Sequence, residues 1–148
     1  MKFIVSGIFL IFFLLLNVNA SAQPDIIFDT DLGGDADDLG ALSMLHHYVD
    51  QGECNLLAVM CWSTEKYAAP AIDAVNRYHD HPDIPVGVRK NTGEPHYTEW
   101  NYSRPLVEKL PHLRSYRDTP DATHLYRKIL AGRPDSSVTL VTVGPLKN

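Results

Sequence analysis

DIIFDTDLGGDADD, residues 25–38, is the stretch of sequence that decides the fold. Its beginning, DIIFD at residues 25–29, is a short apolar run that closes on an acid, which predicts a buried β-strand. Two adjacent glycines then predict a loop. The pair Asp37-Asp38 stands where a helix should begin, because apolar residues recur after it with helical spacing as far as Gly52. The stretch therefore predicts a strand, a tight loop and a helix in succession.

Further apolar runs alternate with helical patterns along the rest of the chain. The run at residues 56–61 predicts a buried strand, and the β-rich run at residues 137–143 predicts another strand. Residues 84–88 predict a strand that Pro85 places at a start or an edge. Alternation of this kind predicts an α/β fold with a mostly parallel, Rossmann-like sheet flanked by helices.

Helices are expected between these strands. Ser63 or Thr64 should cap the second helix. Its inner face is expected to carry Ala68, Ile72, Val75 and Tyr78. The segment 89–119 is rich in proline and predicts a long loop with a short helix near residues 106–110. Asp121 or Thr123 should cap a last helix that runs through Leu130.

The sequence stops directly after its last predicted strand. A parallel strand is normally followed by a crossover that covers its face. We therefore expect the sheet to be incomplete at the C-terminus, as in a fragment of a longer domain.

The N-terminus has the three-part layout of a secretory signal. Lys2 precedes an apolar run at residues 3–16, and small residues stand at positions 20–22. This pattern predicts a signal peptide over residues 1–22, cleaved after Ala20 or Ala22, and a single domain over residues 23–148. The protein is then expected to be exported to the periplasm or secreted, with no stable membrane anchor after cleavage, since the apolar run is short for a bilayer span.

The charge of the chain bears on nucleic-acid binding, and the position of its cysteines bears on disulfide formation. The formal net charge of −5 argues against nucleic-acid binding, which requires a basic face. Cys54 and Cys61 stand seven residues apart along one predicted strand, which places them too far apart for a disulfide. We expect a half-exposed thiol and a buried one.

Five aspartates gather at the end of the first predicted strand: Asp29, Asp31, Asp35, Asp37 and Asp38. In open α/β sheets the carboxyl ends of the strands are where ligands bind. Clustered carboxylates repel one another unless a cation lies between them. Hard oxygen ligands in this number favour Ca²⁺, with Mg²⁺ as the second choice.

Three other interpretations of the cluster remain to be weighed. A solvated acidic loop with Asp37 or Asp38 capping a helix needs no ligand. An EF-hand starting at Asp29 fails, because its fifth and twelfth positions hold Gly33 and Gly40. A haloacid-dehalogenase-like magnesium phosphatase would use Asp29 as nucleophile, but it usually has Thr or Val where Gly33 stands and leaves the later pair without a role.

Two motifs resemble motifs of the inosine-uridine-preferring nucleoside hydrolase family, and they occur in the same order as in that family. The first is Asp29-Thr30-Asp31 followed by glycine and by Asp37-Asp38, which leads into a helix of the Asp-Asp-x-x-Ala-Leu type. The second, VTLVTVGPLKN at residues 138–148, is similar to a family strand that ends in Gly-Pro-Leu-Thr-Asn, with Lys147 in place of Thr. The link from Asp31 to Asp37 is two residues longer than in the commoner pattern, as in a divergent branch.

The resemblance implies calcium-dependent hydrolysis of the N-glycosidic bond of nucleosides to base and ribose, an activity of purine and pyrimidine salvage. It implies that Asp31 binds calcium and acts as the base that takes a proton from water. Asp38 and the backbone carbonyl of Val143 would also bind calcium. Asp37 would bind the ribose hydroxyls, and Asp29 would orient the loop. The expected partner is a small nucleoside, and a homo-oligomer is possible.

Some positions depart from the family pattern. Asp35 lies in the longer link and receives no role. Cys61-Trp62 begins the segment where the family often has a ribose-contacting Asn, and Trp62 suits either stacking on a base or sugar or a place in the core or rim. Family members are also longer, and their later half supplies further ribose and calcium contacts. A non-catalytic ribose- and calcium-binding module is therefore the alternative. His46 and His47 are expected to have a surface or core role, and the other histidines show no ligand spacing.

Overall fold

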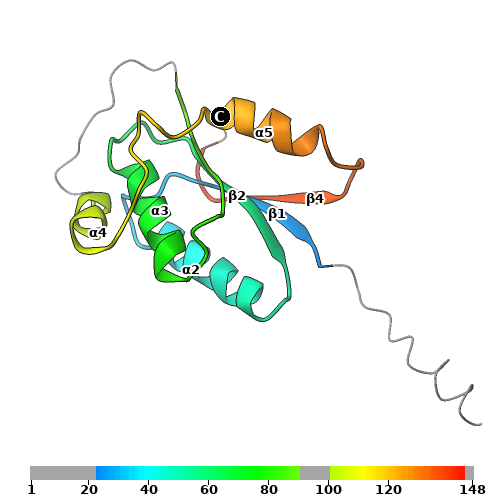
Figure 1. Cartoon of the computed structure of the whole chain (residues 1–148), viewed down its shortest axis with the longest axis horizontal. Coiled ribbons are helices and arrows are strands. Elements are labelled where there is room, and N and C mark those ends of the chain that lie inside the picture. The colour runs from blue at the N-terminus through cyan, green and yellow to red at the C-terminus, as the bar shows by residue number, and fades with distance from the viewer. Residues whose placement is uncertain (1–22, 91–100, 146–148) are drawn as a thin grey trace, which may run out of the picture.

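The computed structural model describes residues 23–90 and 101–145, so the predicted signal peptide lies outside the described residues. The elements follow one another as β1 (Asp25–Thr30), α2 (Asp37–Asp50), β2 (Asn55–Cys61), α3 (Ala68–Tyr78), β3 (Val86–Val88), α4 (Ser103–Lys109), α5 (Ala122–Leu130) and β4 (Val138–Thr142). The strands form one sheet in the order β3-β2-β1-β4, and every neighbouring pair is parallel (Figure 1). The predicted Rossmann-like α/β fold is confirmed.

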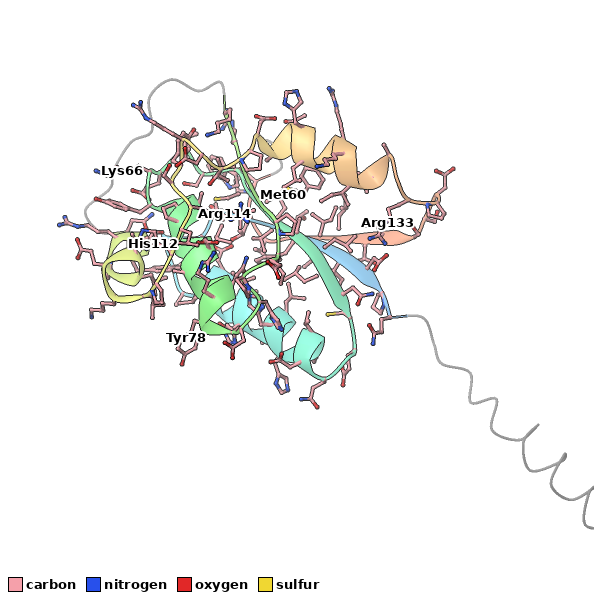
Figure 2. All side chains as sticks on the ribbon, in the orientation of Figure 1. Met60, Lys66, Tyr78, His112, Arg114 and Arg133 are labelled. Carbon is pink, nitrogen blue, oxygen red and sulfur yellow. The ribbon has the colours of Figure 1, made fainter. Side chains whose placement is uncertain are left out.

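Helices cover both faces of this sheet, as Figure 1 shows. Successive residues of a strand point to opposite faces. Phe28 of β1 accordingly lies in the larger apolar cluster, with residues of α2 and α3, whereas Ile27 lies in the smaller cluster with Ala122 of α5. Met60 of β2 belongs to the same smaller cluster and points from the sheet toward α5 in Figure 2. Because both faces of the central strands are buried, their sequences are apolar without alternation.

The strand order reverses between β1 and β4. From β1 the chain adds β2 and then β3 on one side, and β4 is placed on the other side of β1. The pairing of β1 with β4 continues past the end of β4, since the Val143 N–H donates to the Asp29 carbonyl over 2.9 Å. The carboxyl ends of β1 and β4 therefore flank the point at which the strand order reverses. Open α/β sheets bind ligands at this point.

Several predicted boundaries are confirmed. Helix α2 ends just before Gly52, whose φ of +69° suits glycine. Asp121 caps α5, because its carboxylate accepts a hydrogen bond from the His124 N–H at 3.0 Å. Pro70 lies in the first turn of α3, and Pro85 immediately precedes β3, an edge strand.

The predicted cap of α3 is wrong. The residue at the cap is Tyr67, which makes no capping hydrogen bond through its side chain. Ser63 instead orders the preceding loop, since its hydroxyl accepts from the Glu65 N–H at 3.2 Å. The Glu65 carboxylate in turn accepts from the Tyr67 N–H at 2.8 Å and supplies the acceptor expected from Ser63 or Thr64.

Two burial predictions also fail. Tyr78 stands at the last position of α3 and its side chain points outward from the molecule (Figure 2). It is 69% exposed, so it does not belong to the inner face. The expected half-exposed thiol is not found, since Cys54 is 4% exposed and Cys61 is fully buried. Cys54 and Cys61 are both free and buried, which agrees with the prediction that they form no disulfide.

A buried carboxylate fixes the loop that follows α4. Asp73 of α3 is fully buried and forms ion pairs with Arg77 and with Arg114, at 3.0 and 3.1 Å. It also accepts a hydrogen bond from the Leu113 N–H at 2.7 Å. Burial alone would raise the pKa of Asp73, but the Leu113 N–H and the two guanidinium groups lower it below its ordinary value.

Helix α4 begins three residues earlier than expected, at Ser103, and packs against α3. None of the helices in the described part of the chain has the length and apolar character needed to cross a bilayer.

Candidate functional site

The aspartate cluster lies where the strand order reverses, directly after β1 and at the start of α2. Asp31 follows the strand and is partly exposed, whereas Asp37 is exposed and Asp38 is 3% exposed. The loop between strand and helix thus presents carboxylates both to solvent and to the interior. This is the arrangement expected of a site that takes its ligand from solvent and holds it against a rigid sheet.

Gly33 shapes this loop. Its φ of +139° is a conformation that side chains rarely adopt, and a Cβ there would lie 2.3 Å from Asn101 Nδ2 and 2.6 Å from Ser103 Oγ. The Gly33 carbonyl accepts from the Tyr102 N–H at 2.9 Å. The start of α4, distant in sequence, therefore packs directly on the aspartate loop and fixes its course.

Asp38 is held inside the site by Thr30. The Thr30 hydroxyl donates to Asp38 Oδ1 over 2.5 Å and accepts from the Leu32 N–H at 3.0 Å. Burial raises the pKa of Asp38; the hydrogen bond from Thr30 opposes this, and the charges of Asp31 and Asp37 raise it further. The ionised carboxylate is thus kept in one orientation among like charges, a situation that a bound cation would relieve.

Asp35, which has no role in the family pattern, belongs to the cluster. Asp35, Asp37 and Asp38 each offer a carboxylate oxygen, and these oxygens lie within 4.8 Å of one another. A hydrogen bond between the first two raises the pKa of Asp35 and lowers that of Asp37. Three convergent carboxylate oxygens fit a hard cation, and no sulfur or nitrogen ligand stands among them.

The described part of the second motif, residues 138–145, lies beside the first, and residues 146–148 lie outside the described residues. A Cβ on Gly144 would be 2.9 Å from the backbone nitrogen of Asp31 and 2.8 Å from the Trp62 ring. Only glycine allows the chain after β4 to approach the aspartate loop this closely. Val143, whose carbonyl is the predicted calcium ligand, pairs through its N–H with β1 next to this point. The structure therefore brings Asp31, Gly144 and Trp62 together at the carboxyl ends of three neighbouring strands.

Asp29 points to the other face of the sheet. Its side chain is 3% exposed, and its Oδ2 accepts a hydrogen bond from the Tyr126 hydroxyl of α5 at 2.7 Å. A mostly apolar hollow of about 600 Å³ opens beside it, lined by residues of α5 and β4 that include Leu130 and Leu140. The described lining of that hollow contains none of Asp31, Asp37 and Asp38, so we place the site at the strand ends and not in the hollow.

Tyr102 is a site residue that the sequence did not single out. Its hydroxyl is buried, and no hydrogen-bond partner for it stands among residues 23–90 and 101–145. Burial raises the pKa of Tyr102, and the negative charge of Asp38 adds to that effect, as do Asp35 and Asp37. Nothing in the local pattern marked this tyrosine, because it reaches the cluster only through the packing of Gly33 against the start of α4.

Comparison with known proteins adds no relative: no family model matches the chain, and no curated protein matches it.

Proposed function

We propose that this protein is a calcium-dependent nucleoside hydrolase that splits the N-glycosidic bond of a nucleoside into base and ribose. One observation carries the proposal: Asp31 and Gly144 lie together at the point where the strand order reverses, next to the carboxylates of Asp35, Asp37 and Asp38. The described parts of both motifs that resemble the family meet there, although residues 39–137 separate the two motifs in the sequence.

The chemistry of the side chains suits this reaction. When bound, a calcium ion would hold ribose hydroxyls and lower the pKa of a water molecule. Asp31 is partly exposed and would accept the proton of the attacking water. Asp37 would accept hydrogen bonds from the ribose hydroxyls. Asp38, which accepts a hydrogen bond from Thr30, would bind the cation. Glycosidic cleavage develops positive charge on the sugar, which nearby carboxylates stabilise.

Tyr102 adds a donor to this set. A buried hydroxyl that lacks a partner is costly, and a ligand that accepts its hydrogen bond removes that cost. The hydroxyl lies close enough for the charge of Asp38 to raise its pKa. We assign it to an oxygen of the bound sugar.

The geometry favours this function over a phosphatase. A phosphatase of the haloacid-dehalogenase type would need the Asp29 carboxylate as nucleophile. That carboxylate is 3% exposed and is occupied by the Tyr126 hydroxyl on the far face of the sheet.

The test is release of reducing sugar from inosine and uridine by the exported full chain, with calcium and with chelator. We expect calcium-dependent release that Asp31→Asn abolishes and that Asp135→Asn, a change of an exposed acid beyond α5, leaves unchanged. Calcium binding without sugar release would identify a non-catalytic ribose- and calcium-binding module instead. Release of phosphate from a generic ester, lost in Asp29→Asn, would overturn the proposal in favour of the phosphatase.

A further inference from the structure

Three histidines meet near the C-terminal ends of α2 and α3, whereas the aspartate cluster lies at the start of α2. His46 lies in the last half of α2, and His79 and His81 follow α3. The His46 ring is fully buried; its centroid is 4.7 Å from that of His79 and 5.0 Å from that of His81. About 12 Å of helix axis separates His46 from Asp38, so the two clusters are distinct places in the fold. These residues show no ligand spacing in the sequence, because the contact arises between α2 and the segment that follows α3.

Hydrogen bonds fix the tautomer of the His46 ring. Its Nε2 lies 3.0 Å from Asn76 Oδ1. The Asn76 amide nitrogen donates to the Ile84 carbonyl at 3.4 Å, which turns the amide oxygen toward His46. An amide oxygen only accepts, so His46 carries its hydrogen on Nε2 and leaves a lone pair on Nδ1.

The same argument applies to His81. Its Nε2 lies 3.1 Å from Asp50 Oδ1, and a carboxylate only accepts. The hydrogen is therefore on Nε2 here too, and Nδ1 of the neutral ring carries a lone pair. A carboxylate or amide behind an imidazole is the arrangement that orients histidine ligands in metal sites.

The two Nδ1 atoms face each other. They are 2.8 Å apart while the ring centroids are 5.0 Å apart, and the ring planes differ by 26°, so the rings approach edge to edge with these nitrogens between them. Two lone pairs at this distance repel each other unless a cation lies between them. A proton or a metal ion can occupy that position.

We propose that His46 and His81 bind a borderline divalent transition metal ion, such as Zn²⁺, through their Nδ1 atoms, with Asn76 and Asp50 orienting the two rings. Imidazole nitrogen suits Zn²⁺, Cu²⁺ and Ni²⁺, in contrast to the oxygen donors of the aspartate cluster. Tetrahedral Zn–N bonds of about 2.1 Å require the nitrogens to separate to about 3.4 Å. His81 can provide this movement, because its side chain is 20% exposed and it follows the turn residue Asp80.

The surroundings of the pair suit a bound cation. Burial, foremost, and the neighbouring His79 lower the pKa of His46 to about 4, so its ring is a neutral ligand at pH 7. Asp50 is half-exposed and lies 3.1 Å from His81 Nε2. Burial lowers the pKa of His79, and the negative charges of Asp50 and Asp80 oppose that effect. These carboxylates offset the charge of the ion, and water can complete its coordination from the exposed side.

Calorimetric titration of the full chain with ZnCl₂, in the presence of excess calcium, tests the proposal. We expect one zinc ion to bind, and His81→Ala to remove that binding. Asp50→Ala should weaken it about 10- to 100-fold through loss of the orienting partner. His47→Ala, an exposed histidine beside His46 on the same helix, is the matched control and should bind zinc like the wild type.

A second measurement identifies the atoms. Nitrogen-15 NMR of the histidine rings should show zinc displacing the Nδ1 resonances of His46 and His81 while both Nε2 remain protonated. Nδ1 resonances that respond to pH but not to zinc would overturn the proposal and leave a shared proton between the rings. Equal zinc binding by wild type and His81→Ala would overturn it too. Asp38→Asn should retain the zinc effect, so this result is independent of the proposed hydrolase site.

Discussion

Asp38→Asn separates the metal-free stability of the protein from its response to calcium. In the absence of metal, the buried carboxylate is disfavoured by desolvation and by the charges of Asp31 and Asp37, and the amide removes both effects. The Asn oxygen can still accept the hydrogen bond from Thr30. We therefore expect the metal-free variant to be at least as stable as the wild type.

The response to calcium should go the other way. Calcium at a hundred times its dissociation constant stabilises the native state by about 2.7 kcal/mol. For a domain of this size that corresponds to a rise in melting temperature of about 10 °C. Asp38→Asn removes one of three convergent carboxylates and should reduce the rise to less than about 2 °C.

Thermal melts followed by circular dichroism, in chelator and in a calcium series, measure both effects. Asp135→Asn is the control, because it removes one exposed negative charge far along the chain from the cluster. The reasoning would be refuted if the wild type showed no calcium-dependent rise, or if Asp38→Asn showed the same rise as the wild type. A large loss of stability in the metal-free variant would refute the claim that the buried charge is disfavoured.

Three further predictions concern groups outside the cluster. Tyr126→Phe leaves Asp29 with one donor fewer and should cost about 1–3 kcal/mol in urea unfolding; an unchanged midpoint would contradict the importance of that bond. Because the pKa of Asp73 is lowered in the folded protein, its ionised carboxylate stabilises the native state at pH values above the unfolded pKa near 3.8. This stabilisation is lost as the pH falls through the lower pKa of the folded state. Urea melts should therefore show Asp73→Asn less stable than wild type at pH 7, by about 3 kcal/mol, and the gap should narrow toward pH 2. Cys54 and Cys61 are buried and their thiol pKa values are raised, foremost by burial, so a thiol reagent should label neither in the native protein and both in denaturant.

The two central strands could be predicted because they are short runs with both faces covered. The run at residues 56–61 is apolar throughout, and in the run at residues 25–29 two acids flank three apolar residues. Such runs bounded by turn residues have few other stable arrangements. The reversal of strand order did not follow from the pattern, since nothing local states on which side of β1 the last strand pairs.

The aspartates of the site were identifiable because they follow a strand directly, and their position is fixed by that strand. Tyr102 and Tyr126 were not identifiable, because each reaches the carboxylates through contacts between elements far apart in the sequence. The histidine cluster was missed for the same reason: helical spacing places His46 on a face, but only tertiary packing places His81 opposite it. Periodicity thus predicts which face a residue occupies and leaves its partner undetermined.

The pairing of β1 with β4 has a consequence for how the protein matures. Asp31 emerges early in synthesis, and Gly144, which packs on its backbone, emerges more than a hundred residues later. Closing a loop of this length costs conformational entropy before the contact can stabilise the folded state. Pairing between segments so far apart in the sequence also slows folding. The aspartate loop therefore stays incomplete until the last strand has docked. A ligand can bind at this place only after the whole sheet has formed. Ions that bind there would therefore act most strongly on the final step of folding, the docking of β4.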